Sequence, residues 1–147
     1  MKSFLILLLS LGILAQVQAQ KEAVYSTKNG AIKGYDPVAY FTEGKPVKGL
    51  DSISLNWQGA TWHFANSHHR ELFIAEPEKY APQFGGWCAY GWSKGYPAKI
   101  EPEAWSIVDG KLYLNYSLDV RNDWEKKRAE YIQKAEKSYQ KAFVKSN

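Results

Sequence analysis

The residues of this chain that can support metal or redox chemistry are three histidines and one cysteine. His63, His68 and His69 all lie between residues 61 and 73, and Cys88, the only cysteine, follows shortly after. Imidazole and thiolate ligands together suit copper or zinc. We therefore predict a metal site that contains His69 and Cys88. His63 or His68 would supply further donors, with copper as the first candidate metal and zinc as the second.

Other interpretations of the same residues stay open, because no tight ligand pair such as Cys-x-x-Cys or His-x-x-x-His is present. Cys88 can be a small core residue, since free cysteine is often buried. It can also be an enzyme nucleophile with His69 as its base, oriented by Asn66 or Gln83. A cysteine and a histidine in one short chain are weak evidence of catalysis, so we expect a binding protein rather than an enzyme.

Aromatic side chains are the second chemical signal. The chain has 6 Trp and 10 Tyr among its 147 residues, and an excess of such rings often marks an interface or an amphipathic pocket. The alternative function is therefore a small-molecule or protein-binding module without metal, lined by aromatic residues. The rings can equally be core filler in a protein without an internal disulfide. The candidate ligand-binding residues are Trp87, Tyr90, Trp92 and Tyr96.

The first nineteen residues read as a signal peptide. Lys2 supplies a positive charge, residues 4–14 are apolar, and Ala19 ends a stretch with the small residues that signal peptidase requires. The apolar run is shorter than the ~20 residues that span a membrane. We expect export to the periplasm or the extracellular space, without embedding in the membrane once residues 1–19 are removed.

Composition excludes some functions. The formal net charge is +4, but there is no basic block with interleaved aromatics, so nucleic acid is not an expected partner. The expected partner is a metal ion, a small molecule or another protein. The only methionine is Met1, which excludes sites that need a thioether ligand, such as a blue-copper centre with axial Met.

The histidines lie where a strand is expected to lead into a helix. Trp62 and Phe64 alternate with His63, which is typical of a half-buried strand. Asn66 or Ser67 can cap the helix that follows. Residues 69, 72 and 73 then share one face of this helix, so His69, more than His68, is predicted to face the apolar interior.

The remaining pattern predicts an α+β fold. Two antiparallel hairpins are expected, one at 53–57 and 61–64 with a Gln58-Gly59 turn, and one at 105–108 and 111–114 with an Asp109-Gly110 turn. Short helices are expected near 37–41 and 77–82, the first capped by Asp36. One long amphipathic helix, 119–144, should pack across these small hairpins and short helices. Residues 20–33 read as a polar lead-in with little pattern.

Several of these segments resemble a YHS domain, in particular the small exported stand-alone proteins of that family. The resemblance covers residues 34 to about 115. It rests on these motifs: Tyr35-Asp36-Pro37-Val38, Gly59-x-Thr61-Trp62-x-Phe64-Ala65-x-Ser67, Phe73, Pro77-x-x-Tyr80, Gly85-Gly86-x-Cys88-Ala89, and Pro102-x-x-Trp105 leading into Gly110-Lys111-Leu112-Tyr113-Leu114. The organisation it implies is a signal peptide at 1–19, a lead-in at 20–33, a YHS-like domain at 34–118 and a C-terminal helix at 119–147 packed on that domain.

The resemblance implies metal handling, but not through the family's thiolate ligands. YHS domains are similar to TRASH modules, cysteine-bearing metal sensors and chaperones that accompany copper transport. The positions where those modules carry three cysteines are Ala39, Ala65 and His69 in this chain. Only His69 can still act as a ligand, so the thiolate site is not carried over.

Overall fold

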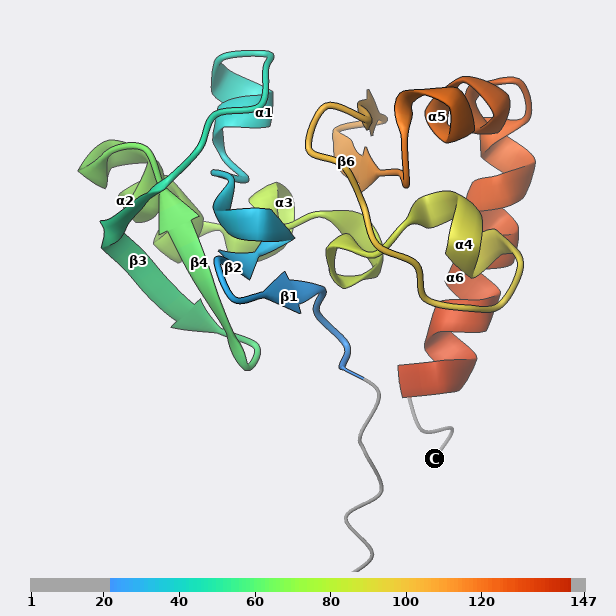
Figure 1. Ribbon diagram of the computed structural model, residues 1–147, viewed down its shortest axis with the longest axis horizontal. Helices are drawn as coiled ribbons and strands as arrows, with labels where there is room; N and C mark the ends of the chain where they lie inside the picture. The colour runs from blue at the N-terminus through green and yellow to red at the C-terminus, as the bar shows by residue number, and fades with distance from the viewer. Residues whose placement is uncertain (1–21, 144–147) are drawn as a thin grey trace, which may run out of the picture.

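The computed structural model describes residues 22–143 and has an α+β fold, as predicted (Figure 1). The predicted signal peptide, residues 1–19, lies outside the described residues. In chain order the elements are β1 (Ser26–Thr27), β2 (Gly30–Ala31), the 3-10 helix η1 (Ile32–Gly34), α1 (Ala39–Thr42), β3 (Leu50–Trp57), β4 (Ala60–Phe64), α2 (Ser67–Ala75), α3 (Pro77–Tyr80), the 3-10 helix η2 (Gln83–Gly86), α4 (Ala89–Ser93), β5 (Trp105–Val108), β6 (Lys111–Leu114), α5 (Leu118–Glu125) and α6 (Arg128–Phe143).

Both predicted hairpins are present. β3 pairs with β4 and β5 with β6, each antiparallel. Both connecting turns have positive φ at their two central residues, 49° and 74° in the first and 51° and 74° in the second, as a type I′ turn requires. The first hairpin is irregular, because the register shifts between Leu50 and Ser54 and leaves the intervening residues of β3 without partners on β4.

The lead-in, which shows little pattern in the sequence, is more ordered than the sequence indicates. It contains the hairpin β1–β2 and then η1, and Ala31 and Ile32 are fully buried. The Tyr25 N–H donates to Gly85 O at 2.9 Å, and the Tyr139 hydroxyl donates to Ala23 O at 2.8 Å. Long-range contacts therefore hold this segment, and its buried residues follow no regular period.

The single helix predicted from residue 119 is divided into α5 and α6 (Figure 1). At the end of α5, the N–H groups of Lys126 and Lys127 bond to carbonyls three residues earlier, which tightens the last turn. Trp124 packs on Tyr113 of β6, whereas Tyr139 packs on Trp92 of α4. Both contacts belong to the same hydrophobic cluster, so α5 and α6 together cover what one helix was predicted to cover.

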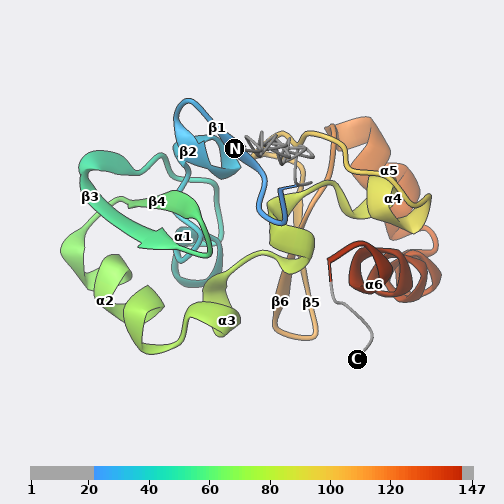
Figure 2. The same ribbon diagram turned by 90° about the horizontal axis from the view of Figure 1, so that it is seen from below.

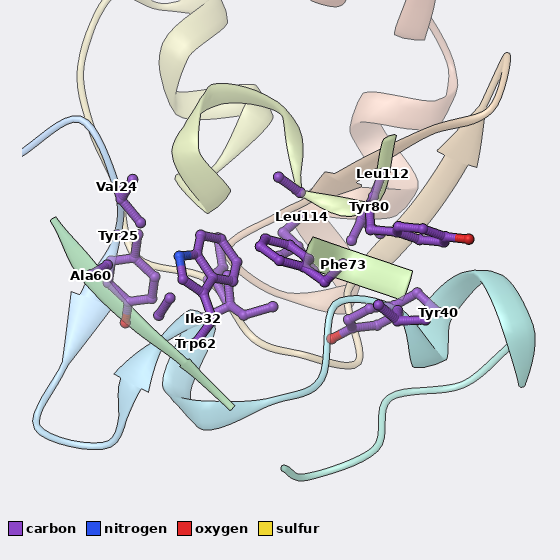
Figure 3. Packing of buried hydrophobic residues seen from close by; sticks show 14 of the residues in the cluster. Val24, Tyr25, Ile32, Tyr40, Ala60, Trp62, Phe73, Tyr80, Leu112 and Leu114 are labelled. Carbon is purple, nitrogen blue, oxygen red and sulfur yellow. The ribbon is translucent and has the colours of Figure 1, made fainter. Parts of the chain in front are cut away.

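Two hydrophobic clusters hold the two halves of the molecule. The first gathers β3–β4, α2, α3 and the lead-in around Ile32, Trp62 and Phe73, with Leu112 and Leu114 of β6 at its border (Figure 3). The second lies between α4, α5 and α6 and contains Trp92 and Trp124. Both ribbon views place α2 at one end of the molecule and α4 with α6 at the other (Figures 1 and 2).

Among residues 22–143, no helix combines the length and the apolar character that crossing a membrane would require.

Candidate functional site

His69 is held in place by the start of α2. The Asn66 side chain accepts from the His69 backbone N–H at 2.8 Å, which is the predicted N-cap. His69 and Phe73 are buried, while His68, Arg70 and Glu71 are exposed. The predicted face of this helix is therefore confirmed, with His69 only 6% exposed.

The imidazole of His69 meets a buried carboxylate from a distant segment. His69 Nδ1 lies 2.6 Å from Oδ2 of Asp36, which is fully buried. The same carboxylate accepts backbone N–H groups from Val38 at 2.8 Å, Ala39 at 3.3 Å and Ala65 at 2.8 Å. Because an ionised carboxylate is an acceptor only, four donors around it indicate that Asp36 is charged. Asp36 therefore joins the start of α1 to the β4–α2 junction.

The other ring nitrogen of His69 is the chemically available one. Nε2 lies 3.2 Å from the hydroxyl of Thr42, an exposed residue at the end of α1. The Thr42 hydroxyl donates its proton to Val38 O at 3.2 Å. In the neutral tautomer with Nδ1–H donating to Asp36, Nε2 carries a lone pair, and an electrophile would reach it by displacing the Thr42 hydroxyl.

The other two histidines differ in their surroundings. His68 is exposed, and its ring centroid lies 6.5 Å from that of His69. His63 is buried, with Nδ1 3.3 Å from Leu50 O. Its ring lies so close to Gly30 that an added Cβ there would come within 2.6 Å of the ring, and Gly30 also has φ +104°. His68 is free to approach a ligand beside His69, whereas His63 is part of the packing of the irregular hairpin.

Cys88 is the N-cap of α4 and shares no hydrogen-bond partner with His69. It is 1% exposed, its thiol donates to Asn115 Oδ1 at 3.5 Å, and its sulfur accepts the Gly91 N–H at 3.4 Å. Burial raises the pKa of the Cys88 thiol, and nearby backbone N–H groups offset this only in part. A raised pKa disfavours the thiolate that a nucleophile or a metal ligand needs, so the structure gives Cys88 the properties of a core residue.

The aromatic residues predicted to bind a ligand are mostly engaged inside the protein. Trp92 is 1% exposed, and half-buried Tyr90 packs against Tyr131 at 5.2 Å between ring centroids. Half-buried Trp87 donates its indole N–H to Glu22 O at 3.0 Å. Tyr96 is 52% exposed. Trp87, Tyr90 and Trp92 therefore serve chiefly to pack η2 and α4, whereas Tyr96 stands out in solvent.

No group of three or more His, Cys, Asp or Glu side chains suited to a metal ion occurs within residues 22–143. The imidazoles of His68 and His69 lie near one another, with ring centroids 6.5 Å apart; His68 is exposed and His69 is buried. A carboxylate on Nδ1 is the usual support of a metal-binding histidine, and Asp36 lies in that position.

The sequence analysis missed the role of three residues that contact His69 or Cys88. Asp36 was predicted only as a helix cap, whereas Thr42 and Asn115 were not singled out. The Asp-Pro-Val motif predicts an Asp36 side chain that accepts local N–H groups, and the structure confirms this. Its contact with His69 joins residues 33 apart in the chain, and no local pattern records such a contact.

Comparisons of the chain with models of protein families, with curated proteins and with solved structures find no match. The resemblance to YHS domains therefore stays a prediction from the motifs.

Proposed function

We propose that this protein is an exported binding protein of the YHS type that handles a transition metal, copper first and zinc second, through His69. The observation that carries the proposal is the 2.6 Å contact between His69 Nδ1 and the buried carboxylate of Asp36. With Nδ1–H donating to Asp36, this contact orients the ring and favours the tautomer whose Nε2 carries the lone pair.

The metal would be bound at the surface near the end of α1. His69 Nε2 is the first donor, and rotation of exposed Thr42 would open the approach to it. His68 supplies a second imidazole from the same helix turn, since its exposed side chain can reorient from its present 6.5 Å ring separation. Neither Cys88 nor His63 takes part, because both side chains are buried within other contacts.

The test is calorimetric titration of the purified protein with Cu(II) and Zn(II), with electron paramagnetic resonance of the Cu(II) form to count imidazole nitrogens. We expect His69→Gln to lower the affinity by at least tenfold, and His68→Ala to lower it by roughly tenfold. Circular dichroism must show that each variant is folded. Cys88→Ala is the matched control, and its affinity should equal that of the wild type.

Two results would contradict the proposal. One is an unchanged affinity in a folded His69→Gln variant, which would place the metal elsewhere. The other is loss of binding in Cys88→Ala, which would mean that the Cys88 thiol is a metal ligand and that the α4 region opens to expose it.

A further inference from the structure

A hollow of about 430 Å³ lies where the end of β3 meets the junction of α2 and α3, and no residue of the proposed metal site lines it. Its walls combine one indole, small apolar side chains, an amide and charged groups. They are formed by Trp57, Gln58, Ala75, Glu76, Pro77, Glu78 and Lys79.

The indole of Trp57 is fixed by the core beneath it. Its ring meets Phe73 edge to face, at 5.4 Å and 90°, and meets Trp62 at 5.9 Å and 63°. The Trp62 indole N–H donates to Trp57 O at 3.1 Å, which also anchors the backbone. Trp57 itself is only half-buried. A half-buried indole held on its inner side is a pre-ordered contact surface for a ligand.

The charge in the hollow is negative. Lys79 Nζ is 3.5 Å from Glu76 Oε2, and it lies 5.1 Å from the ring centroid of Tyr80. Glu76 raises the pKa of Lys79, so this lysine stays charged and is neutralised by its neighbour. Glu78 has no ion-pair partner among residues 22–143. One uncompensated carboxylate therefore lines the hollow together with the indole.

We propose that this hollow binds an organic ammonium group, such as a quaternary amine, against Trp57 and Glu78. Tryptophan is the side chain that attracts cations most strongly through its ring face. Glu78 supplies the counter-charge, and Ala75 and Pro77 supply apolar contacts for the alkyl groups on nitrogen. The proposal does not depend on the metal site, because the two sites share no residue.

The test is a nuclear magnetic resonance titration of the ¹⁵N-labelled protein with choline. The matched ligand control is 3,3-dimethylbutanol, which has the same shape without the charge. We expect saturable shifts at residues 57–58 and 75–79, with a dissociation constant on the order of millimolar. The neutral alcohol should bind at least about fivefold more weakly, as the loss of a cation–π contact implies.

Two variants separate the site from the general charge of the protein. Glu78→Gln should weaken choline binding roughly threefold to fivefold, and Trp57→Phe, which keeps an aromatic ring in the packing, roughly threefold. Glu71→Gln removes the same charge from an exposed position of α2 outside the hollow and should leave binding unchanged.

Three outcomes would overturn the proposal. They are the absence of saturable shifts at these residues, equal binding of the neutral alcohol, and an equal effect of Glu71→Gln and Glu78→Gln. The last would mean that choline follows only the surface charge.

Discussion

His69 and Cys88, which were predicted to share one metal site, belong to two buried polar centres that have no hydrogen-bond partner in common. The Asp36 centre consists of Asp36, His69 and Thr42, and the Cys88 centre consists of Cys88 and Asn115. Each joins segments that are far apart in the chain. At the Asp36 centre one ring nitrogen reaches an exposed threonine, whereas at the Cys88 centre the sulfur and both its neighbours are enclosed.

The difference shows what makes a buried polar group available for chemistry. Asp36 remains charged because four N–H groups surround it, and that charge orients an imidazole whose other nitrogen contacts exposed Thr42. Cys88 stays a neutral thiol because burial raises its pKa. Both centres are hydrogen-bonded, so hydrogen bonding alone does not distinguish them. The Asp36 centre differs because it contains an ionised group and a neighbour that contacts an exposed residue.

The largest effect is expected from breaking the Asp36 centre. Asp36→Ala removes the acceptor of three backbone N–H groups and of the imidazole, all at a fully buried position. We expect a loss of about 3–5 kcal/mol in the free energy of unfolding, measured by urea denaturation with tryptophan fluorescence. Asp51→Ala, at an exposed carboxylate, should change it by less than about 0.5 kcal/mol. A loss below about 1 kcal/mol in Asp36→Ala would show that the carboxylate is not the link we describe.

A smaller effect is expected from the Cys88 centre. Asn115 Oδ1 accepts the Tyr90 N–H at 3.0 Å as well as the thiol, so Asn115→Ala leaves a buried N–H without its acceptor. We expect a loss of about 2 kcal/mol in the free energy of unfolding. Asn115 Nδ2, by contrast, is buried without a hydrogen-bond partner among the described residues, and its removal should recover part of the loss. The control is Asn122→Ala, at an exposed position of α5, whose free energy of unfolding should stay within about 0.5 kcal/mol of the wild type. An equal loss of stability in the two variants would mean that the Cys88 centre does not stabilise the fold.

The smallest effect concerns the thiol itself and its dependence on pH. The pKa of Cys88 is raised in the folded protein by burial, whereas an unfolded cysteine ionises near ~8.5. Between the unfolded and the folded pKa, only the unfolded chain releases the thiol proton, which favours unfolding. The protonated thiol therefore contributes fully to stability below the unfolded pKa, and this contribution is lost as the pH rises toward the folded pKa.

Between pH 8 and 9.5 the wild type should lose about 1 kcal/mol more free energy of unfolding than Cys88→Ala. Parallel urea titrations of the two proteins measure this difference, and tyrosine ionisation cancels because both proteins share it. An identical pH dependence would mean that the thiol is not enclosed, which would reopen its role as a metal ligand.

Local sequence patterns predicted much of the fold. The Asp109-Gly110 turn, the Asn66 cap and the buried face of α2 depend on residues within a few positions of one another, and the structure confirms each of them. The order of the lead-in and the break in the C-terminal helix were not predicted. The lead-in is held by contacts with Gly85 and Tyr139, which are distant in the chain, and the amphipathic stripe of residues 119–144 does not show that it is divided into α5 and α6.

The sequence by itself determined the fold class, the two hairpins and which of His68 and His69 faces the core, because periodicity and turn chemistry are local properties. The tertiary structure alone decided that His69 is paired with Asp36 and that Cys88 is enclosed with Asn115. The type of a side chain does not decide whether it is available for chemistry. Its burial and the charge of its neighbours decide this, and folding brings those neighbours from distant parts of the chain.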